Sequence, residues 1–159
     1  MDMSHDTRLT TRFFKKVDAS GECHEWTASK MTGGYGLFVI DKKNKCAHRV
    51  AYEIAYGPFD QSMFVDHICH NRACVNPKHL RLATAKQNAE NRAGAPRHGK
   101  TGVRGVTWHK QSKKWWAKAG HNGRLHSAGL YHSIEEAEEA VIALRNRLFT
   151  HNIIDRQAS

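Results

Sequence analysis

Cysteine and histidine are concentrated in one short stretch of the chain, Val65–Leu80, with the sequence VDHICHNRACVNPKHL. Four residues separate Cys69 from Cys74, and His79 lies five residues after Cys74. Thiolate sulfur and imidazole nitrogen are the donors that a structural zinc ion takes in a closed tetrahedron. The spacing therefore predicts a structural zinc site with three ligands in this box.

The fourth ligand must come from outside the box, and Cys23 and Cys46 are the two candidates. Cys23 is favoured because it lies near Trp26 in a turn-rich stretch, where a metal bond would hold the N-terminal segment against the box. Free cysteines are often simply buried, but two of them with a histidine so close favour a metal. The polar N-terminus has no features of a secretory signal, so disulfides are not expected.

Several spacings in and around the box together resemble one known family, the HNH nucleases, in the zinc-bearing branch related to the His-Cys box homing endonucleases. The residues that carry the resemblance are Asp66-His67, Cys69, Cys74, Asn76-Pro77, His79-Leu80 and Asn88, with Cys23–Trp26, Gly33–Gly36 and Ala47–Arg49 before them. The resemblance spans about Phe13 to Arg92. It implies a ββα-metal core, in which two strands and a helix hold one catalytic divalent ion. Since no cysteine follows Cys74, a second zinc cluster of the two-zinc branch is excluded.

The residues of the box also have the chemistry that phosphodiester hydrolysis needs. His67 is suited to be the general base, because imidazole titrates near neutral pH. Asp66 and Asn88 offer oxygen atoms, which Mg²⁺ prefers, and Mn²⁺ could replace it. The resemblance implies that Asn76 braces the loop between strand and helix. Arg49 is a candidate phosphate clamp, while His48 and His70 have no spacing argument of their own.

The C-terminal part of the chain is strongly basic. No acidic residue occurs between Asn91 and Ile134, and tryptophans are interleaved with the basic residues there. The segment Lys100–Phe149 is similar to the DNA-binding domain of the Apetala/ethylene-response-factor class, which implies a sheet that lies in the major groove of DNA. The positions that match the DNA-contacting ones are Arg104, Trp108, Lys110, Trp116, Lys118 and Arg124. Alternation along a strand puts Trp115 and Trp116 on opposite faces, and which one faces DNA stays open.

The elements that must position these residues predict an α+β protein. A zinc-stapled ββα-metal nuclease domain (1–92) is followed by a linker (93–100), a domain of three antiparallel strands packed on one helix (101–150) and a tail (151–159). Expected strands are 35–40, 64–68, 102–109, 114–121 and 125–131, and a strand-to-helix segment covers 46–55. Expected helices are 7–17, one after Thr84 and one after Ser133, where the sequence has the form of a capping box.

Composition narrows the partners. The 159 residues carry a formal net charge of +10, which favours a polyanion, and we expect double-stranded DNA. No apolar run could cross a membrane, so a protein of the host cytoplasm is expected. The leading hypothesis is a freestanding homing-type endonuclease that leaves 5′-phosphate and 3′-hydroxyl ends. The alternative is a non-catalytic, zinc-containing DNA-binding regulator. An RNA nuclease is less favoured, and the sequence does not decide between monomer and homodimer.

Overall fold

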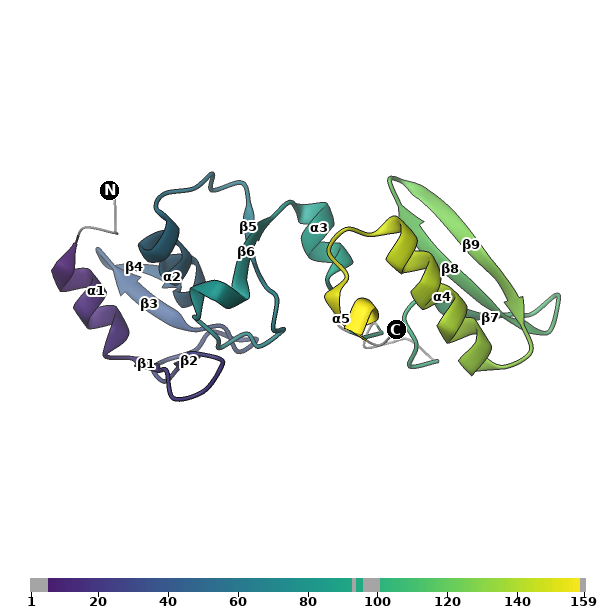
Figure 1. Cartoon of the computed structure of the whole chain (residues 1–159), viewed down its shortest axis with the longest axis horizontal. Helices are drawn as coiled ribbons and strands as arrows, with labels where there is room; N and C mark the ends of the chain where they lie inside the picture. Colours follow the sequence, from purple (N-terminus) through teal and green to yellow (C-terminus); the bar gives the residue numbers. More distant parts are fainter. Residues whose placement is uncertain (1–5, 93, 96–100, 158–159) are drawn as a thin grey trace. The chain divides into compact units, whose positions relative to one another are not determined.

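The computed structural model describes residues 6–92, 94–95 and 101–157. Contacts along the chain divide it into two units, Met1–Ala85 and Lys86–Ser159, and each unit is described by itself (Figure 1). The described residues form a mixture of helices and small antiparallel sheets. The division falls before residue 92, the predicted end of the nuclease domain, and most of the predicted linker lies outside the described residues.

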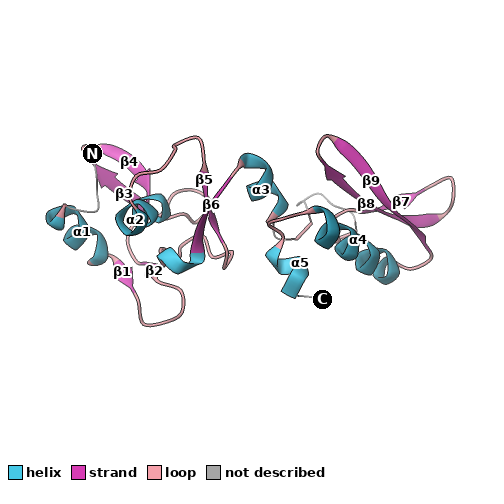
Figure 2. Cartoon of the chain, turned by 45° about the horizontal axis from the view of Figure 1, so that its top comes forward, coloured by secondary structure: helices cyan, strands magenta, loops and turns pink. Residues whose placement is uncertain are grey.

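The described residues of the first unit, 6–85, form two α-helices and three two-stranded antiparallel sheets (Figure 2). The helices are α1 (Thr7–Phe14) and α2 (Ala47–Tyr56). The sheets pair β1 (Val17–Asp18) with β2 (Glu25–Trp26), β3 (Leu37–Ile40) with β4 (Lys43–Cys46), and β5 (Phe64–His67) with β6 (Leu80–Ala83). A short 3-10 helix, η1 (Pro77–His79), leads directly into β6.

An aromatic cluster forms the centre of the first unit. Phe13 of α1 is fully buried, and its ring lies 5.1 Å from that of Trp26 and 5.2 Å from that of Phe38. The carboxylate of Asp6 caps α1 by accepting the Leu9 N–H at 2.9 Å. The helix ends at Phe14, earlier than the expected residue 17, because the chain there enters β1. Burial of the three large rings anchors the N-terminal segment beside the segment that carries Cys23.

Four strands of the first unit were not expected from the sequence, the short pair β1 and β2 as well as β4 and β6. The segment 41–45 was predicted as a turn, but only Asp41 and Lys42 form it, with positive φ angles of 47° and 60°, and β4 begins at Lys43. β4 carries exposed polar side chains, so it shows no apolar alternation. β6 follows the metal-binding box and pairs Arg81 with Asp66. The order β5, β6 and then helix α3 (Ala85–Glu90) is consistent with a ββα arrangement.

The second unit is a three-stranded antiparallel sheet covered by a helix, as predicted for the C-terminal domain. The sheet has the order β7 (Val106–His109), β8 (Lys114–His121), β9 (Arg124–Tyr131), and α4 (Ile134–Leu148) packs on it. Val106, Ala117, Ala137 and Val141 form the buried core between them. The expected capping box is present. The Ser133 hydroxyl accepts a hydrogen bond from Glu136 N–H, and the Glu136 carboxylate accepts one from Ser133 N–H. A last helix, α5 (Ile153–Gln157), was not expected.

Two tight features fix this sheet. Asn122 and Gly123 join β8 to β9 with positive φ angles of 51° and 72°, which is the two-residue hairpin turn expected for Asn-Gly. Gly105 precedes β7 with a φ of 86°. A Cβ atom there would meet the Lys118 carbonyl oxygen at 2.6 Å and Val141 Cγ2 at 2.8 Å. Only glycine allows this approach between the strand and α4.

Candidate metal centre and active site

Four side chains with soft donor atoms gather in the first unit: Cys23, Cys69, Cys74 and His79. Their ligand atoms all lie within 4.8 Å of one another. Backbone pairing places them, because Trp26 N–H donates to Ala73 O at 2.9 Å and Val75 N–H donates to His24 O at 2.7 Å. These bonds set Cys23 beside Cys74. Ile68 N–H donates to His79 O at 2.8 Å, which brings His79 next to Cys69.

Two of the separations between donor atoms match those in a zinc tetrahedron. His79 Nδ1 lies 3.6 Å from Cys23 Sγ and 3.7 Å from Cys74 Sγ. Zinc bonds of ordinary length would separate sulfur and nitrogen by about 3.6 Å. Burial raises the pKa of the Cys74 thiol to about 12, with Cys69 and Cys23 adding to the effect. Burial also raises the pKa of the Cys69 thiol, and a nearby cation would favour the thiolate form of both residues, so the cluster could hold a metal such as zinc.

The structure groups Cys23, and not Cys46, with the box. Cys46 ends β4, and its sulfur lies 4.0 Å from the sulfur of Met31. Asn76, the predicted loop brace, lies next to the cluster, two residues after Cys74. Its side chain donates to Glu22 O at 2.8 Å and accepts from Lys78 N–H at 3.1 Å, while its own N–H approaches Cys74 Sγ at 3.4 Å. Asn76 thus joins the loop that carries Cys23 to the turn that carries His79.

His67, the predicted general base, is the last residue of β5 and is buried, with 6% of its surface exposed. Its Nε2 lies 3.0 Å from the carbonyl oxygen of Cys74. A carbonyl oxygen can only accept, so Nε2 carries the proton of the neutral ring and Nδ1 is the basic nitrogen. Burial lowers the pKa of His67, against the opposing effects of the Cys74 carbonyl and Asp66. The ring is therefore neutral at pH 7 and able to take up a proton.

Two further rings surround His67 that the sequence did not assign. The His48 ring on α2 lies 4.6 Å from that of His67, and the Tyr35 ring lies 5.4 Å from His48 and 5.9 Å from His67. His48 is 6% exposed, and burial, with the nearby His67 and Arg49, lowers its pKa to about 3. These neutral rings fix the plane of the His67 imidazole. The helical position of His48, directly after the β3–β4 hairpin, is the one signal that could have indicated this.

Asp66, the predicted magnesium ligand, precedes His67 in β5 and is 8% exposed. Arg81 on β6 is its cross-strand partner, and the Nε and Nη2 atoms of Arg81 both donate to Asp66 Oδ2 at 3.0 Å. Arg81 could not be predicted from the sequence, because only the register of the unexpected β6 places it opposite Asp66. The guanidinium compensates the charge of this buried carboxylate and orients it.

Asn88 lies in α3, within the second unit, and is half-buried. Its donor chemistry, like that of Asp66, suits Mg²⁺, and that both bind one ion stays a prediction. Arg49, the predicted phosphate clamp, is occupied in the first unit. Its Nη1 donates to Met63 O at 2.9 Å and its Nη2 to Gln61 Oε1 at 2.9 Å. These bonds favour a structural role in which Arg49 fixes the loop before β5, and the phosphate contact also stays a prediction.

In the second unit, the strand register sorts the predicted DNA contacts by face. Trp115 lies on the face of buried Val106 and Ala117 and packs against the core. Trp116 therefore lies on the open face, which carries no helix. Its Nε1 donates to Ser127 Oγ at 2.8 Å, and Lys118 Nζ lies 4.0 Å from its ring centroid. Trp116 and Lys118, both half-buried, thus form a pair of an aromatic ring and a cation on this face.

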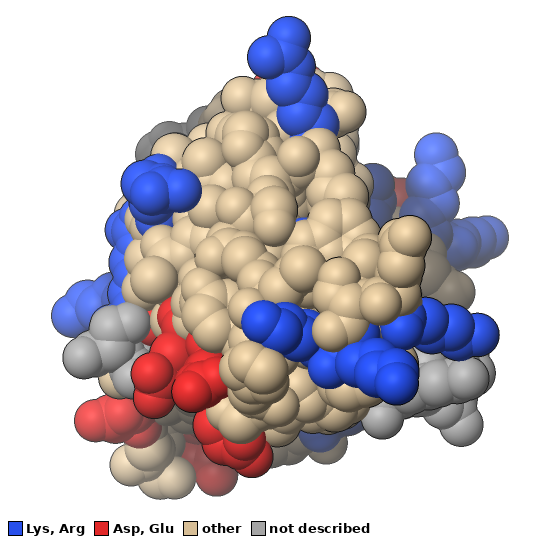
Figure 3. All heavy atoms as spheres, turned by 90° about the vertical axis from the view of Figure 1, so that its right-hand side faces the viewer, with Lys and Arg blue, Asp and Glu red and all other residues tan. Residues whose placement is uncertain are grey.

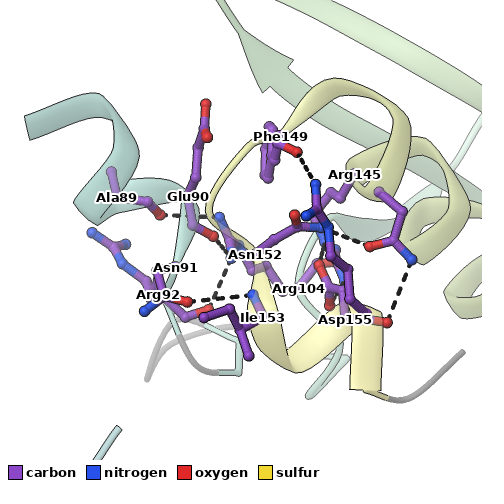
Figure 4. Close-up of polar contacts among 12 residues, drawn as sticks. Ala89, Glu90, Asn91, Arg92, Arg104, Arg145, Phe149, Asn152, Ile153 and Asp155 are labelled. Atoms are coloured by element: carbon purple, nitrogen blue, oxygen red, sulfur yellow. Dashed lines mark hydrogen bonds and ion pairs between the residues drawn. The ribbon is translucent and has the colours of Figure 1, made fainter. Parts of the chain in front are cut away.

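Trp108 lies on the helix-covered face of the sheet, and Arg104 contacts the end of α3. Trp108 is 47% exposed but is paired with Trp115 on the helix-covered face, at a ring distance of 4.8 Å. Arg104 donates to backbone carbonyl oxygens at the end of α3 (Figure 4), at 3.2 Å from Ala89, 3.0 Å from Glu90 and 2.8 Å from Arg92. A guanidinium held by three carbonyl oxygens acts as a helix C-cap. Direct DNA contact by Arg104 is thus disfavoured and stays a prediction.

The remaining predicted contacts, Lys110 and Arg124, are exposed at the two hairpin ends of the sheet. Figure 3 views the second unit from its end: Lys and Arg side chains are spread over the surface, and Asp and Glu gather at one edge. Two acidic residues begin α4, Glu135 and Glu136, where they stabilise the N-terminus of that helix. The charges of this unit are therefore segregated, with the sheet free of acidic residues.

Comparison with known proteins identifies the metal-binding box. Residues 45–90 match the family model of HNH endonucleases. This stretch contains Asp66, His67 and three of the four cluster residues. No solved structure matches the chain.

The chain is also homologous to proteins of Escherichia phage T7. It is 40% identical to Protein 7.7 over 79 residues, 30% identical to Protein 3.8 over 80 residues and 36% identical to Protein 2.8 over 76 residues. These matches cover 50%, 50% and 46% of this chain, and 61%, 65% and 50% of the relatives. Among the described residues, no helix is long and apolar enough to span a membrane.

Proposed function

We propose that this protein is a DNA endonuclease with a structural zinc ion, one catalytic Mg²⁺ and His67 as its general base. The observation that carries the proposal is the hydrogen bond from His67 Nε2 to the Cys74 carbonyl, within the segment that matches HNH endonucleases. This bond assigns the proton of the neutral ring to Nε2 and leaves Nδ1 as the nitrogen that can accept a proton.

The chemistry follows from these groups. His67 Nδ1 takes a proton from a water molecule, whose oxygen attacks the phosphorus of the scissile phosphodiester. The bond from phosphorus to the 3′ oxygen breaks, and that oxygen takes a proton from solvent. The products are a 5′-phosphate and a 3′-hydroxyl. Mg²⁺ bound by the oxygens of Asp66 and Asn88 would supply Lewis-acid stabilisation of the phosphate and of the leaving oxygen.

The second unit would fix the position of the nuclease on double-stranded DNA. The half-buried Trp116–Lys118 pair and the acid-free sheet support an Apetala/ethylene-response-factor-like mode, in which an open sheet face lies in the major groove. Homology to three phage T7 proteins supports a phage-encoded, homing-type enzyme acting in the host cytoplasm. One active site per chain would cut one strand at a time.

The experiment is plasmid cleavage by wild type and His67→Ala in the presence of Mg²⁺. We expect wild type to nick or linearise supercoiled DNA, and the variant to be slower by about 10²–10⁴-fold, the usual contribution of a general base. His132→Ala is the matched control, because His132 is an exposed histidine outside the candidate site. Zinc content and DNA affinity of each variant are measured in parallel.

The outcomes separate the two hypotheses. Cleavage by wild type and by the control, lost in His67→Ala at equal zinc content, supports the enzyme. If no variant cleaves DNA with Mg²⁺ or Mn²⁺ although all bind it, the protein is instead the non-catalytic DNA-binding regulator.

A further inference from the structure

A groove of about 550 Å³ lies between α3 and the β8–β9 hairpin, wholly within the second unit. Neither Trp116 nor Lys118 is among its lining residues. Five of its twelve lining residues carry charged side chains: Lys86, Glu90, Arg92, Arg104 and Arg124. His121 and Asn122 are the other polar side chains among the lining residues. The groove is therefore lined mainly by charged groups among its polar side chains, and it has few neutral donors and acceptors with which to distinguish one base from another.

The single acidic side chain of the groove is already compensated from within. Glu90 is 4% exposed, and its Oε2 accepts from the Thr150 N–H at 3.0 Å and the Thr150 hydroxyl at 3.2 Å. Lys86 Nζ lies 3.1 Å from Glu90 Oε1. His121 Nδ1 lies 3.7 Å from the same oxygen. The carboxylate is thus turned inward, and it does not oppose an anion at the mouth of the groove.

The outer cations have no such compensation. Arg92 and Arg124 are exposed, and neither forms an ion pair with an acidic residue in the described part of the chain. Both belong to the segment 91–134, which contains no acidic residue. Two uncompensated guanidinium groups facing one open groove concentrate positive potential there. Guanidinium groups bind phosphate oxygens in a bidentate manner, so an oxyanion is the ligand that this groove fits.

We propose that this groove is a second DNA-binding site, which holds the phosphodiester backbone through Arg92 and Arg124 and sets the orientation of the second unit on the duplex. The proposal rests on the DNA binding of the proposed function but not on cleavage. Backbone contacts of this kind position a protein without reading sequence. The hairpin of Asn122 and Gly123 carries Arg124, and α3 carries Lys86. A phosphate bound between them would join these two elements of the unit.

The test is the salt dependence of DNA binding by the full-length protein, measured by fluorescence anisotropy on a labelled duplex without Mg²⁺. Each lost phosphate contact lowers the slope of log affinity against log salt by about 1. We expect this fall in Arg92→Ala and in Arg124→Ala, and partial or full rescue in Arg124→Lys, which keeps the charge. Arg147→Ala is the matched control, because Arg147 is exposed on α4 and does not line the groove.

A double variant then asks whether the groove and the open face are separate sites. Lys118→Ala combined with Arg124→Ala should lower the slope by about 2, the sum of two independent contacts. Slopes of Arg92→Ala and Arg124→Ala that equal that of Arg147→Ala would overturn the groove. A wild type that fails to bind duplex DNA would overturn both this site and the proposed function. A wild type that binds, shows the expected slopes and never cleaves leaves the groove standing and removes the nuclease.

Discussion

The proposed zinc cluster can be tested through its fourth ligand, because the chain offers two cysteines that differ in position and little in burial. Cys23 lies in the cluster with its sulfur 3.6 Å from His79 Nδ1, whereas Cys46 lies beside Met31. Both are half-buried free cysteines. We therefore expect Cys23→Ser to lose the metal and Cys46→Ser to retain it at one zinc per chain.

The size of the effect follows from what else holds the Cys23 loop. Four hydrogen bonds join the loop to the box, from Trp26 N–H, Val75 N–H and the side-chain amides of Asn71 and Asn76. At about 1 kcal/mol each, they contribute about 4 kcal/mol. Ordering the seven residues 19–25 costs at least about 7 kcal/mol of conformational entropy. The remaining deficit of about 3 kcal/mol must be met by the metal, and structural zinc supplies more than this.

The assay combines zinc quantification with thermal unfolding. A loss of about 3 kcal/mol lowers the melting temperature of a unit of this size by at least about 12 °C. We expect that fall in Cys23→Ser, and an equal fall when wild type is treated with a chelator. The chelator should have no further effect on Cys23→Ser. Retention of zinc by Cys23→Ser together with its loss from Cys46→Ser would refute the assignment and make Cys46 the ligand.

Two further predictions concern stability. Gly105→Ala places a methyl group 2.6 Å from the Lys118 carbonyl oxygen at positive φ, so it should destabilise the second unit by about 2–5 kcal/mol. Gly123 also has a positive φ, but a Cβ there would meet nothing within 4 Å, so Gly123→Ala should lower the free energy of unfolding by only about 1 kcal/mol. Equal losses of stability in the two variants, measured by thermal unfolding, would contradict the clash at Gly105. The second concerns pH. Because the folded pKa of His48 is about 3, below the usual 6.5, the unfolded chain alone binds its proton as the pH falls below 6.5. The free energy of unfolding, measured by denaturant titration, should thus drop by about 2 kcal/mol from pH 6.5 to 5 in the wild type and by less in His48→Phe. If the two proteins lost the same stability over this pH range, the prediction would be wrong.

Local signals in the sequence predicted much of the second unit. The Asn122-Gly123 turn and the Ser133–Glu136 capping box depend on residues within four positions of each other, and both are present. The strand 114–121 was predicted with the same limits as β8, since aromatic and basic residues are bounded by turn signals. The C-terminal helix α5 was missed, because its position depends on a distant contact, the ion pair between Arg145 and Asp155 at 2.6 Å.

The candidate site was predicted only in part, for the same physical reason. The residue types in the box indicated a metal site. The choice between Cys23 and Cys46 depends on backbone hydrogen bonds between segments about fifty residues apart, and the spacing of the cysteines in the sequence holds no information on these bonds. The partner of Asp66 required the register of β6, a strand too short to recognise after η1. Arg104 was predicted from a family position, and its use as a cap on α3 follows from a tertiary contact.

Cys74 connects the two parts of the candidate site through a single residue. Its thiol belongs to the metal cluster, and its carbonyl accepts the proton of His67 Nε2 at 3.0 Å. A metal that fixes the sulfur also restricts the backbone of the same residue, and hence the tautomer and the plane of the imidazole. Removal of the metal would free residues 74–79 and the carbonyl with them. In the proposed enzyme, a structural ion bound by the Cys74 thiol would thus hold the His67 imidazole in place for proton transfer without taking part in the reaction itself.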